Sequence, residues 1–155
     1  MLTTRTATAR TATAALLLGA VLALTGCSAN ASARGELSQT AKDAASSAGS
    51  AASSIRLHEN AQLTEAVLGT GLEDVGSQLA DSAKNLTTLA AVGGIAARRD
   101  RILREVRSAQ DVLLDAQSQL SVGKGDDHSL EPQRRKLAAL SVTLQKEYQQ
   151  LDAHG

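Results

Sequence analysis

The chain has 155 residues, with 16 basic and 16 acidic side chains and a formal net charge of zero. A balanced charge provides no strong positive field to attract nucleic acid. Tyr148 is the only aromatic residue, which disfavours sugar-binding platforms and base-stacking surfaces, because both depend on aromatic faces. The length allows one small domain, and a core of Leu, Val, Ile and Ala suits helices.

Residues 1–26 have the organisation of an export signal. Arg5 and Arg10 give this segment a positive start, and the stretch from Ala14 to Leu24 is short and carries no charge. The apolar stretch is shorter than the roughly 20 residues that a helix needs to span a bilayer. We therefore expect residues 1–26 to be removed when the protein is exported.

The signal ends with Leu24, Thr25, Gly26 and Cys27. These residues resemble the lipobox of bacterial lipoproteins in identity, order and position. The resemblance implies that the thiol of Cys27 receives a diacylglycerol, that a signal peptidase cuts before this cysteine, and that the freed amine receives an acyl chain. Cys27 is the only cysteine, so its thiol has no disulfide partner within the chain. We expect the mature protein on the extracytoplasmic face of the bacterial cell membrane, where several acyl chains anchor it firmly.

Residues 27–50 follow the lipidated cysteine with a sequence dominated by Ala, Ser and Gly. This composition buries little apolar area and predicts a flexible tether in front of a helical domain at residues 51–155. The alternative is a weak helix that orders against a partner. It is favoured by apolar residues at alternating steps of four and three, namely Leu37, Ala41, Ala44, Ala48, Ala51 and Ile55.

Three later segments carry apolar stripes with the period of an amphipathic helix. The middle stripe keeps its alternation over nineteen residues and resembles a coiled-coil seam. The three stripes are Leu72, Val75, Leu79, Ala83, Leu86 and Leu89; Ile102, Val106, Ala109, Leu113, Ala116 and Leu120; and Leu137, Leu140, Leu144, Tyr148 and Leu151.

Glycines separate these segments, because glycine lowers helix stability and paired glycines mark stops. The breaks are expected at Gly69-Thr70-Gly71, at Gly93-Gly94 and in a loop before Pro132, which suits the first turn of a helix. The pattern predicts an all-α, small antiparallel bundle of four helices. Three helices, with one bent at the Gly93-Gly94 pair, are the alternative. The four expected helices lie near residues 52–68, 72–92, 95–122 and 131–153.

No arrangement of residues typical of catalysis is found. The chain has no phosphate-binding glycine loop, and none of its serines lies in a Gly-x-Ser-x-Gly or Ser-x-x-Lys motif. Asp126, Asp127 and His128 are adjacent in a glycine-rich loop, so their side chains diverge instead of converging on one metal ion. His58 and His154 have no nearby sequence partner. We expect no enzyme activity, no metal and no cofactor beyond the lipid on Cys27.

Five arginines fall within ten residues at the start of the third expected helix. Helical spacing places successive members near one another, as a basic strip beside the apolar seam. The strip is a candidate contact for lipid headgroups or for an acidic partner. A solvated face balanced by neighbouring acidic residues is the alternative. The candidate contact residues are Arg98, Arg101, Arg104 and Arg107.

These observations favour a membrane-anchored, non-catalytic interaction or adaptor module of the bacterial cell envelope. Its expected partners are the membrane, through the lipid anchor, and an envelope protein that binds the alanine-rich seam between Leu37 and Leu68. Nucleic acid is not expected, because loss of Arg5 and Arg10 leaves 14 of the 16 basic residues against 16 acidic ones. The sequence indicates no oligomeric state. The alternatives are a carrier or sensor of a small apolar ligand held between helices, and a passive spacer.

Overall fold

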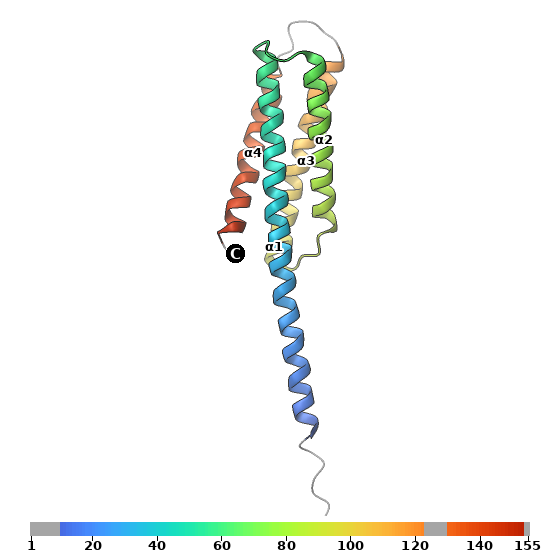
Figure 1. The fold of residues 1–155 in the computed structure, drawn as a ribbon, viewed down its shortest axis with the longest axis vertical. Coiled ribbons are helices and arrows are strands. Elements are labelled where there is room, and N and C mark those ends of the chain that lie inside the picture. The colour runs from blue at the N-terminus through green and yellow to red at the C-terminus, as the bar shows by residue number, and fades with distance from the viewer. Residues whose placement is uncertain (1–9, 123–129, 154–155) are drawn as a thin grey trace, which may run out of the picture.

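The computed structural model is a bundle of four helices (Figure 1). It describes the backbone of residues 10–122 and 130–153 and the side chains of residues 30–122 and 130–153. Successive helices run in opposite directions, and each packs against its neighbours in the ring α1–α2–α3–α4. The predicted all-α antiparallel four-helix bundle is confirmed. Its helices are α1 (Arg10–Glu59), α2 (Glu65–Thr88), α3 (Gly93–Ser121) and α4 (Glu131–Asp152).

The core is built mainly from the predicted stripes. Each of helices α2, α3 and α4 turns its leucine, isoleucine or valine stripe inward, and these side chains form one continuous cluster with α1. Burial of such side chains is the main favourable term in folding. Fully or almost fully buried members are Leu72, Leu79, Leu86, Ile102, Val106, Leu113, Leu137, Leu144 and Leu151.

The prediction of a flexible tether over residues 27–50 is wrong. Helix α1 passes through this segment without a break, so the helical alternative is the one found. Its small side chains allow close helix packing: Ser141 Oγ donates a hydrogen bond to the Ala45 carbonyl at 2.7 Å, and a β-carbon at Gly49 would lie 3.0 Å from that Oγ. Burial against α2 and α4 offsets the weak helix preference. The buried face is Ala33, Leu37, Ala41, Ala44, Ala45, Ala48, Ala51, Ala52 and Ile55.

The turn between α1 and α2 also lies elsewhere than predicted. We expected a helix over 52–68 and a break at Gly69-Thr70-Gly71, but α1 ends at Glu59 and both glycines lie inside α2. The N-terminus of α2 is set by Thr64, whose hydroxyl oxygen accepts a hydrogen bond from the backbone N–H of Val67 at 3.4 Å. Complete burial of Leu68 and Leu72 offsets the cost of the glycines.

The turn between α2 and α3 confirms the four-helix interpretation over the bent helix. Gly93 has φ +59, a left-handed conformation that glycine adopts without strain, and it begins α3. Pro132 lies in the first turn of α4, where no helical hydrogen bond is lost. The loop at 123–129 lies outside the described residues.

One end of the bundle is distinguished by α1, which has 50 residues against 22 to 29 in the other helices and extends beyond them. We call this end the base: α2 ends there, α3 begins there and α4 ends there (Figure 1). In the part of the chain that the structure describes, none of the helices combines the length and apolar character needed to cross a membrane.

Candidate functional site

The lipobox residues Leu24, Thr25, Gly26 and Cys27 lie on α1, before the first residue whose side chain is described. Lipidation of Cys27 stays a prediction. The helix joins this cysteine directly to the bundle, since Ala33, only 3% exposed, follows six residues later. At 1.5 Å per residue, these six residues span roughly 9 Å along the helix axis. A lipid on Cys27 would therefore lie close to the base of the bundle.

The arginine strip divides into residues with different roles, and the first two hold a buried acid. Arg98 Nε lies 3.5 Å from Glu147 Oε2, and Arg101 Nη1 donates a hydrogen bond to Glu147 Oε1 at 3.2 Å. The Glu147 side chain on α4 is only 9% exposed. A carboxylate removed from water in this way needs compensating charge. Arg98 and Arg101 thus connect α3 to α4, which the sequence could not indicate because Glu147 is more than forty residues away.

Arg99 connects α3 to the end of α2. Its Nη1 donates a hydrogen bond to the Leu89 carbonyl at 2.9 Å, and its Nη2 lies 2.8 Å from Asp100 Oδ1. Leu89 is the C-cap of α2, so Arg99 satisfies a carbonyl at a helix end that α2 itself leaves open. The guanidinium therefore fixes the turn between α2 and α3.

Arg104 and Arg107 are exposed, as Arg101 also is. Within residues 30–122 and 130–153, neither makes an ion pair or a side-chain hydrogen bond. The strip therefore divides into paired and unpaired arginines, and its contact with lipid or a partner stays a prediction. Arg98, Arg99 and Arg101 stabilise contacts between helices, whereas Arg104 and Arg107 remain available to solvent or to a partner.

A second charged cluster joins the far ends of α1 and α4. Glu131, in the first turn of α4, accepts hydrogen bonds from Arg134 and Arg135, and Arg134 Nε lies 3.2 Å from Glu59 Oε2 on α1. The hydrogen bonds from Arg134 and then Arg135 lower the pKa of the Glu131 carboxyl, and Glu131 in turn raises the pKa of Arg134. This cluster locks a helix start, where a negative charge is also favoured by the helix dipole.

A surface groove runs between α2 and α3. Its first part has a volume of about 800 Å³, and a second part of about 390 Å³ shares Glu73, Leu114 and Gln117 with it. Leu114 projects from α3 with 63% of its surface exposed. Across from it, α2 offers mostly small residues, and a β-carbon at Gly69 or Gly76 would meet no atom within 4 Å. The small residues of this face are Ala66, Gly69, Gly76 and Ala80.

The sequence analysis did not predict this groove, although the spacing of two glycines on α2 is a signal of it. Gly69 and Gly76 are seven residues apart on α2, which places them on one face of a helix. We took Gly69 as part of a helix break, and Leu114 escaped notice beside the core residue Leu113. An exposed leucine next to a face of small residues is a feature of helix-binding grooves.

The partner surface that we predicted between Leu37 and Leu68 is not open. Both of these leucines and the alanines between them on α1 are buried in the bundle. The grooves between α2 and α3 are open to the surface. The seam therefore does not provide the open binding surface that the sequence suggested.

Of the histidines and the candidate metal ligands, His58 is the one that lies among the described residues. His58 Nδ1 lies 3.0 Å from the Leu63 carbonyl oxygen and bridges the turn between α1 and α2. Asp126, Asp127, His128 and His154 lie outside the described residues. Among the residues whose side chains are described, no three His, Cys, Asp or Glu side chains gather where a metal ion could be held.

No family model, curated protein or solved structure matches this chain. Its function must therefore be inferred from its own residues: the lipobox, the groove between α2 and α3, and the base from which α1 extends toward Cys27.

Proposed function

We propose that this protein is a lipid-anchored, non-catalytic adaptor of the bacterial cell envelope, which binds a helix of a partner protein in the groove between α2 and α3. The observation that carries the proposal is Leu114, which is 63% exposed beside open space at Gly69 and Gly76. An exposed leucine beside open space gives an apolar side chain of a partner room to pack against it.

The shape of the groove favours a helical partner. Two antiparallel helices form its walls, and the small residues on α2 leave room for another helix to approach closely. The acidic residues Glu65 and Glu73 line the groove, so a complementary helix would carry Lys or Arg toward α2 and apolar residues toward Leu114. This places the adaptor surface on a different pair of helices from the alanine-rich seam.

The lipobox supports the anchored state. Acyl chains on Cys27 would hold the bundle at the extracytoplasmic membrane surface, because each additional chain strengthens membrane binding. Helix α1 would then keep the groove at a fixed height above the membrane, within reach of membrane proteins. A carrier of small apolar ligands is less favoured, since a carrier would enclose its ligand and these grooves are open.

The adaptor function can be tested with a photo-crosslinking amino acid placed at Leu114 in living cells. Val142 on α4, which is 55% exposed and outside the groove, provides the matched control position. We expect one membrane protein to crosslink at position 114 and not at 142, and we expect a Gly76→Leu change to abolish that crosslink. Identical crosslinking at both positions, or none at 114, would overturn the adaptor proposal.

The anchor is tested separately by changing Cys27→Ser. Acyl-chain mass spectrometry should find diacylglycerol on the native protein, and the variant should leave the membrane fraction. A variant that stays in that fraction, or a native protein without acyl chains, would contradict lipid anchoring.

A further inference from the structure

We propose that the base of the bundle is a lipid-contacting surface, which seats on the headgroup layer of the membrane that holds Cys27. This inference rests on the anchoring part of the proposed function and concerns a different surface from the groove. It adds an orientation: the bundle does not move freely on its anchor but stands on the membrane through the turn between α2 and α3.

The first observation is the apolar character of that turn. Residues 89–97 read Leu-Ala-Ala-Val-Gly-Gly-Ile-Ala-Ala and contain no charged, hydroxyl or amide side chain. Turns between helices usually face water and are polar. Here Val92 is 66% exposed, more than any other valine, leucine or isoleucine with a described side chain. An apolar turn that projects from the end of a bundle is suited to a surface less polar than water.

The second observation is that this turn is held rigidly. Arg99 Nη1 donates to the Leu89 carbonyl at 2.9 Å, and the backbone N–H of Leu89 donates to the Asn85 carbonyl at 3.0 Å. Leu89 is 8% exposed and anchors the turn in the core. Val92 is therefore presented outward from a fixed frame, so little conformational freedom would be lost on contact with a membrane.

The third observation is the position of the turn relative to the anchor. It lies at the end of the bundle from which α1 extends toward Cys27 (Figure 1). Six residues of helix, roughly 9 Å, separate Cys27 from the first buried residue, Ala33. The headgroup layer on each side of a bilayer is about 5–8 Å thick. With Cys27 at the boundary of the acyl chains, a modest tilt of α1 brings the turn into the headgroups.

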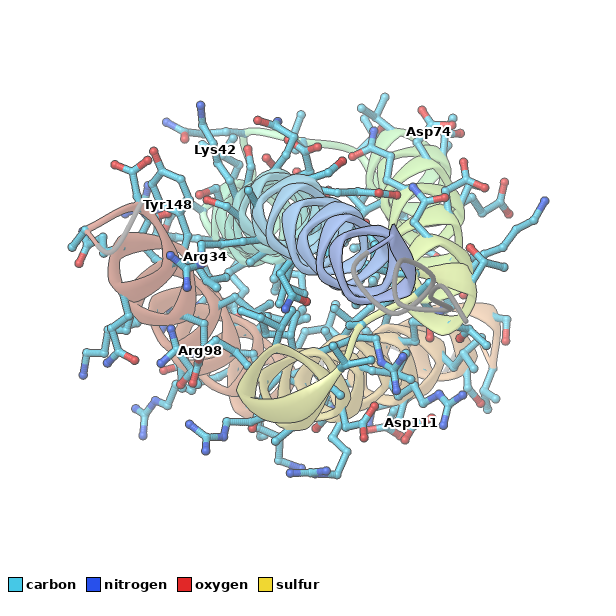
Figure 2. All side chains as sticks on the ribbon, turned by 90° about the horizontal axis from the view of Figure 1, so that it is seen from below. Arg34, Lys42, Asp74, Arg98, Asp111 and Tyr148 are labelled. Atoms are coloured by element: carbon cyan, nitrogen blue, oxygen red, sulfur yellow. The ribbon has the colours of Figure 1, made fainter. Side chains whose placement is uncertain are left out.

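Two arginines lie toward the same end of the bundle. Figure 2 looks at the bundle from this end and shows Arg34 on α1 and Arg98 on α3, both on the side of α4. Arginine donates several hydrogen bonds to phosphate. Arg98 retains 27% side-chain exposure although it pairs with Glu147. Glu36 and Asp152 lie at the same end, so the fit depends on the apolar turn more than on net charge.

The described turn at the opposite end of the bundle is polar. Its residues, 59–65, read Glu-Asn-Ala-Gln-Leu-Thr-Glu and begin and end with an acid. Val67 and Val122 are exposed near this end, and Arg134 and Arg135 pair with Glu131 there. The contrast between the two ends therefore lies in the polarity of their turns, and the apolar turn is the one at the end from which α1 extends toward Cys27.

The test uses the fact that Cys27 is the only cysteine, so that lipidation leaves no free thiol in the mature protein. A single cysteine is introduced at Val92→Cys or, as the matched control at the opposite end, at Gln62→Cys, and labelled with an environment-sensitive fluorophore. Both positions are exposed, which makes unfolding by the label unexpected. The lipidated proteins are reconstituted into vesicles of equimolar phosphatidylcholine and phosphatidylglycerol. Lipids spin-labelled near the headgroup serve as quenchers.

We expect the probe at position 92 to be quenched several-fold more strongly than the probe at position 62. If the protein is acylated but the probe at 92 is quenched no more than the probe at 62, the membrane-contact proposal is overturned. Lipid anchoring would still hold. If mass spectrometry finds no acyl chain on the native protein, both the membrane-contact proposal and lipid anchoring are overturned. A probe at 92 that is unquenched in vesicles but crosslinks to a protein in cells would assign the turn to a protein partner instead.

Discussion

At the scale of single residues, Glu147 shows how a charged side chain can be kept nearly buried. Its carboxylate lies between α3 and α4, and its Oε2 has no hydrogen bond, although Arg98 Nε is 3.5 Å away. Most of its compensation therefore comes from the ion pairs with Arg98 and Arg101. Removing both arginines would leave a buried charge without a partner, which is more costly than the loss of an exposed ion pair.

We predict that Arg98→Ala/Arg101→Ala lowers the free energy of unfolding by about 1–3 kcal/mol. Arg104→Ala/Arg107→Ala is the matched control, because both residues are exposed on the same helix, and we expect a change within about 0.5 kcal/mol. Urea denaturation followed by circular dichroism measures both. Equal losses in the two double variants would show that the strip acts as one unit and that Glu147 is not its structural partner.

Glu131 gives the molecule a specific sensitivity to acid. Hydrogen bonds from Arg134 and Arg135 lower the pKa of its carboxyl, so its ionised form is favoured in the folded state. A group with a lowered folded pKa contributes stability above its unfolded pKa, about 4.3 for Glu, and loses that contribution as the pH falls through the folded pKa. The native protein should therefore exceed Glu131→Gln in stability at neutral pH and lose this advantage below about pH 4.

The matched control for this prediction is Glu65→Gln, since Glu65 also lies in the first turn of a helix. Both changes remove a negative charge near a helix N-terminus, so their difference isolates the arginine hydrogen bonds. Free energies of unfolding from denaturant titrations at neutral and acid pH measure it. An effect of Glu131→Gln that is no larger than that of Glu65→Gln, or that does not shrink in acid, would contradict the prediction.

At the scale of helices, two adjacent residues of α3 face different surroundings: one lies in the core and the next lies in the groove. Leu113 is 1% exposed and Leu114 is 63% exposed. We predict that Leu113→Asp lowers the free energy of unfolding by at least about 3 kcal/mol, because a buried carboxylate would lack a partner. Leu114→Asp should change it by no more than about 0.5 kcal/mol. Thermal unfolding by circular dichroism compares the two variants. Similar melting temperatures would show that the middle stripe, on α3, does not form the core.

The helices also show how far the sequence determines the fold. The turn at Gly93 and the start of α4 at Pro132 were predictable, because both positions have strong local signals. The turn between α1 and α2 was not, since its left-handed residue is Ala61, with φ 55, and not a glycine. The glycines that did suggest a break lie inside α2. There, tertiary burial of Leu68 and Leu72 outweighs local propensity.

The candidate site likewise contains features that local sequence patterns predict and features that depend on how the helices pack. The resemblance of residues 24–27 to a lipobox is a local pattern, and the lipidation that it implies stays a prediction. The pairing of Glu147 with two arginines and the space beside Leu114 depend on how separate helices align, which no local pattern records. The groove became visible only when Gly69, Gly76 and Leu114 were placed on facing helices.

At the scale of the whole molecule, α1 joins the segment that carries Cys27 to the bundle in one continuous helix. Its residues 33–52 contribute eight buried apolar side chains, from Ala33 to Ala52, with Leu37 the largest of them. Without that face, the buried leucines of α2 and α4 would lose a helix against which both of these helices pack. The domain boundary at residue 51, suggested by composition, thus cuts through the packed bundle.

A comparison of two shortened chains decides between a tether and a core helix. We predict that residues 30–155 fold cooperatively, whereas residues 51–155, the domain expected from composition, do not. Each exposed Leu loses about 1.5–3 kcal/mol of burial, and several such losses approach the total stability of a small domain, about 5–15 kcal/mol. Thermal unfolding by circular dichroism, with dye binding to detect exposed apolar surface, measures both chains. Equal melting temperatures would restore the flexible tether and remove the rigid link on which the orientation at the membrane depends.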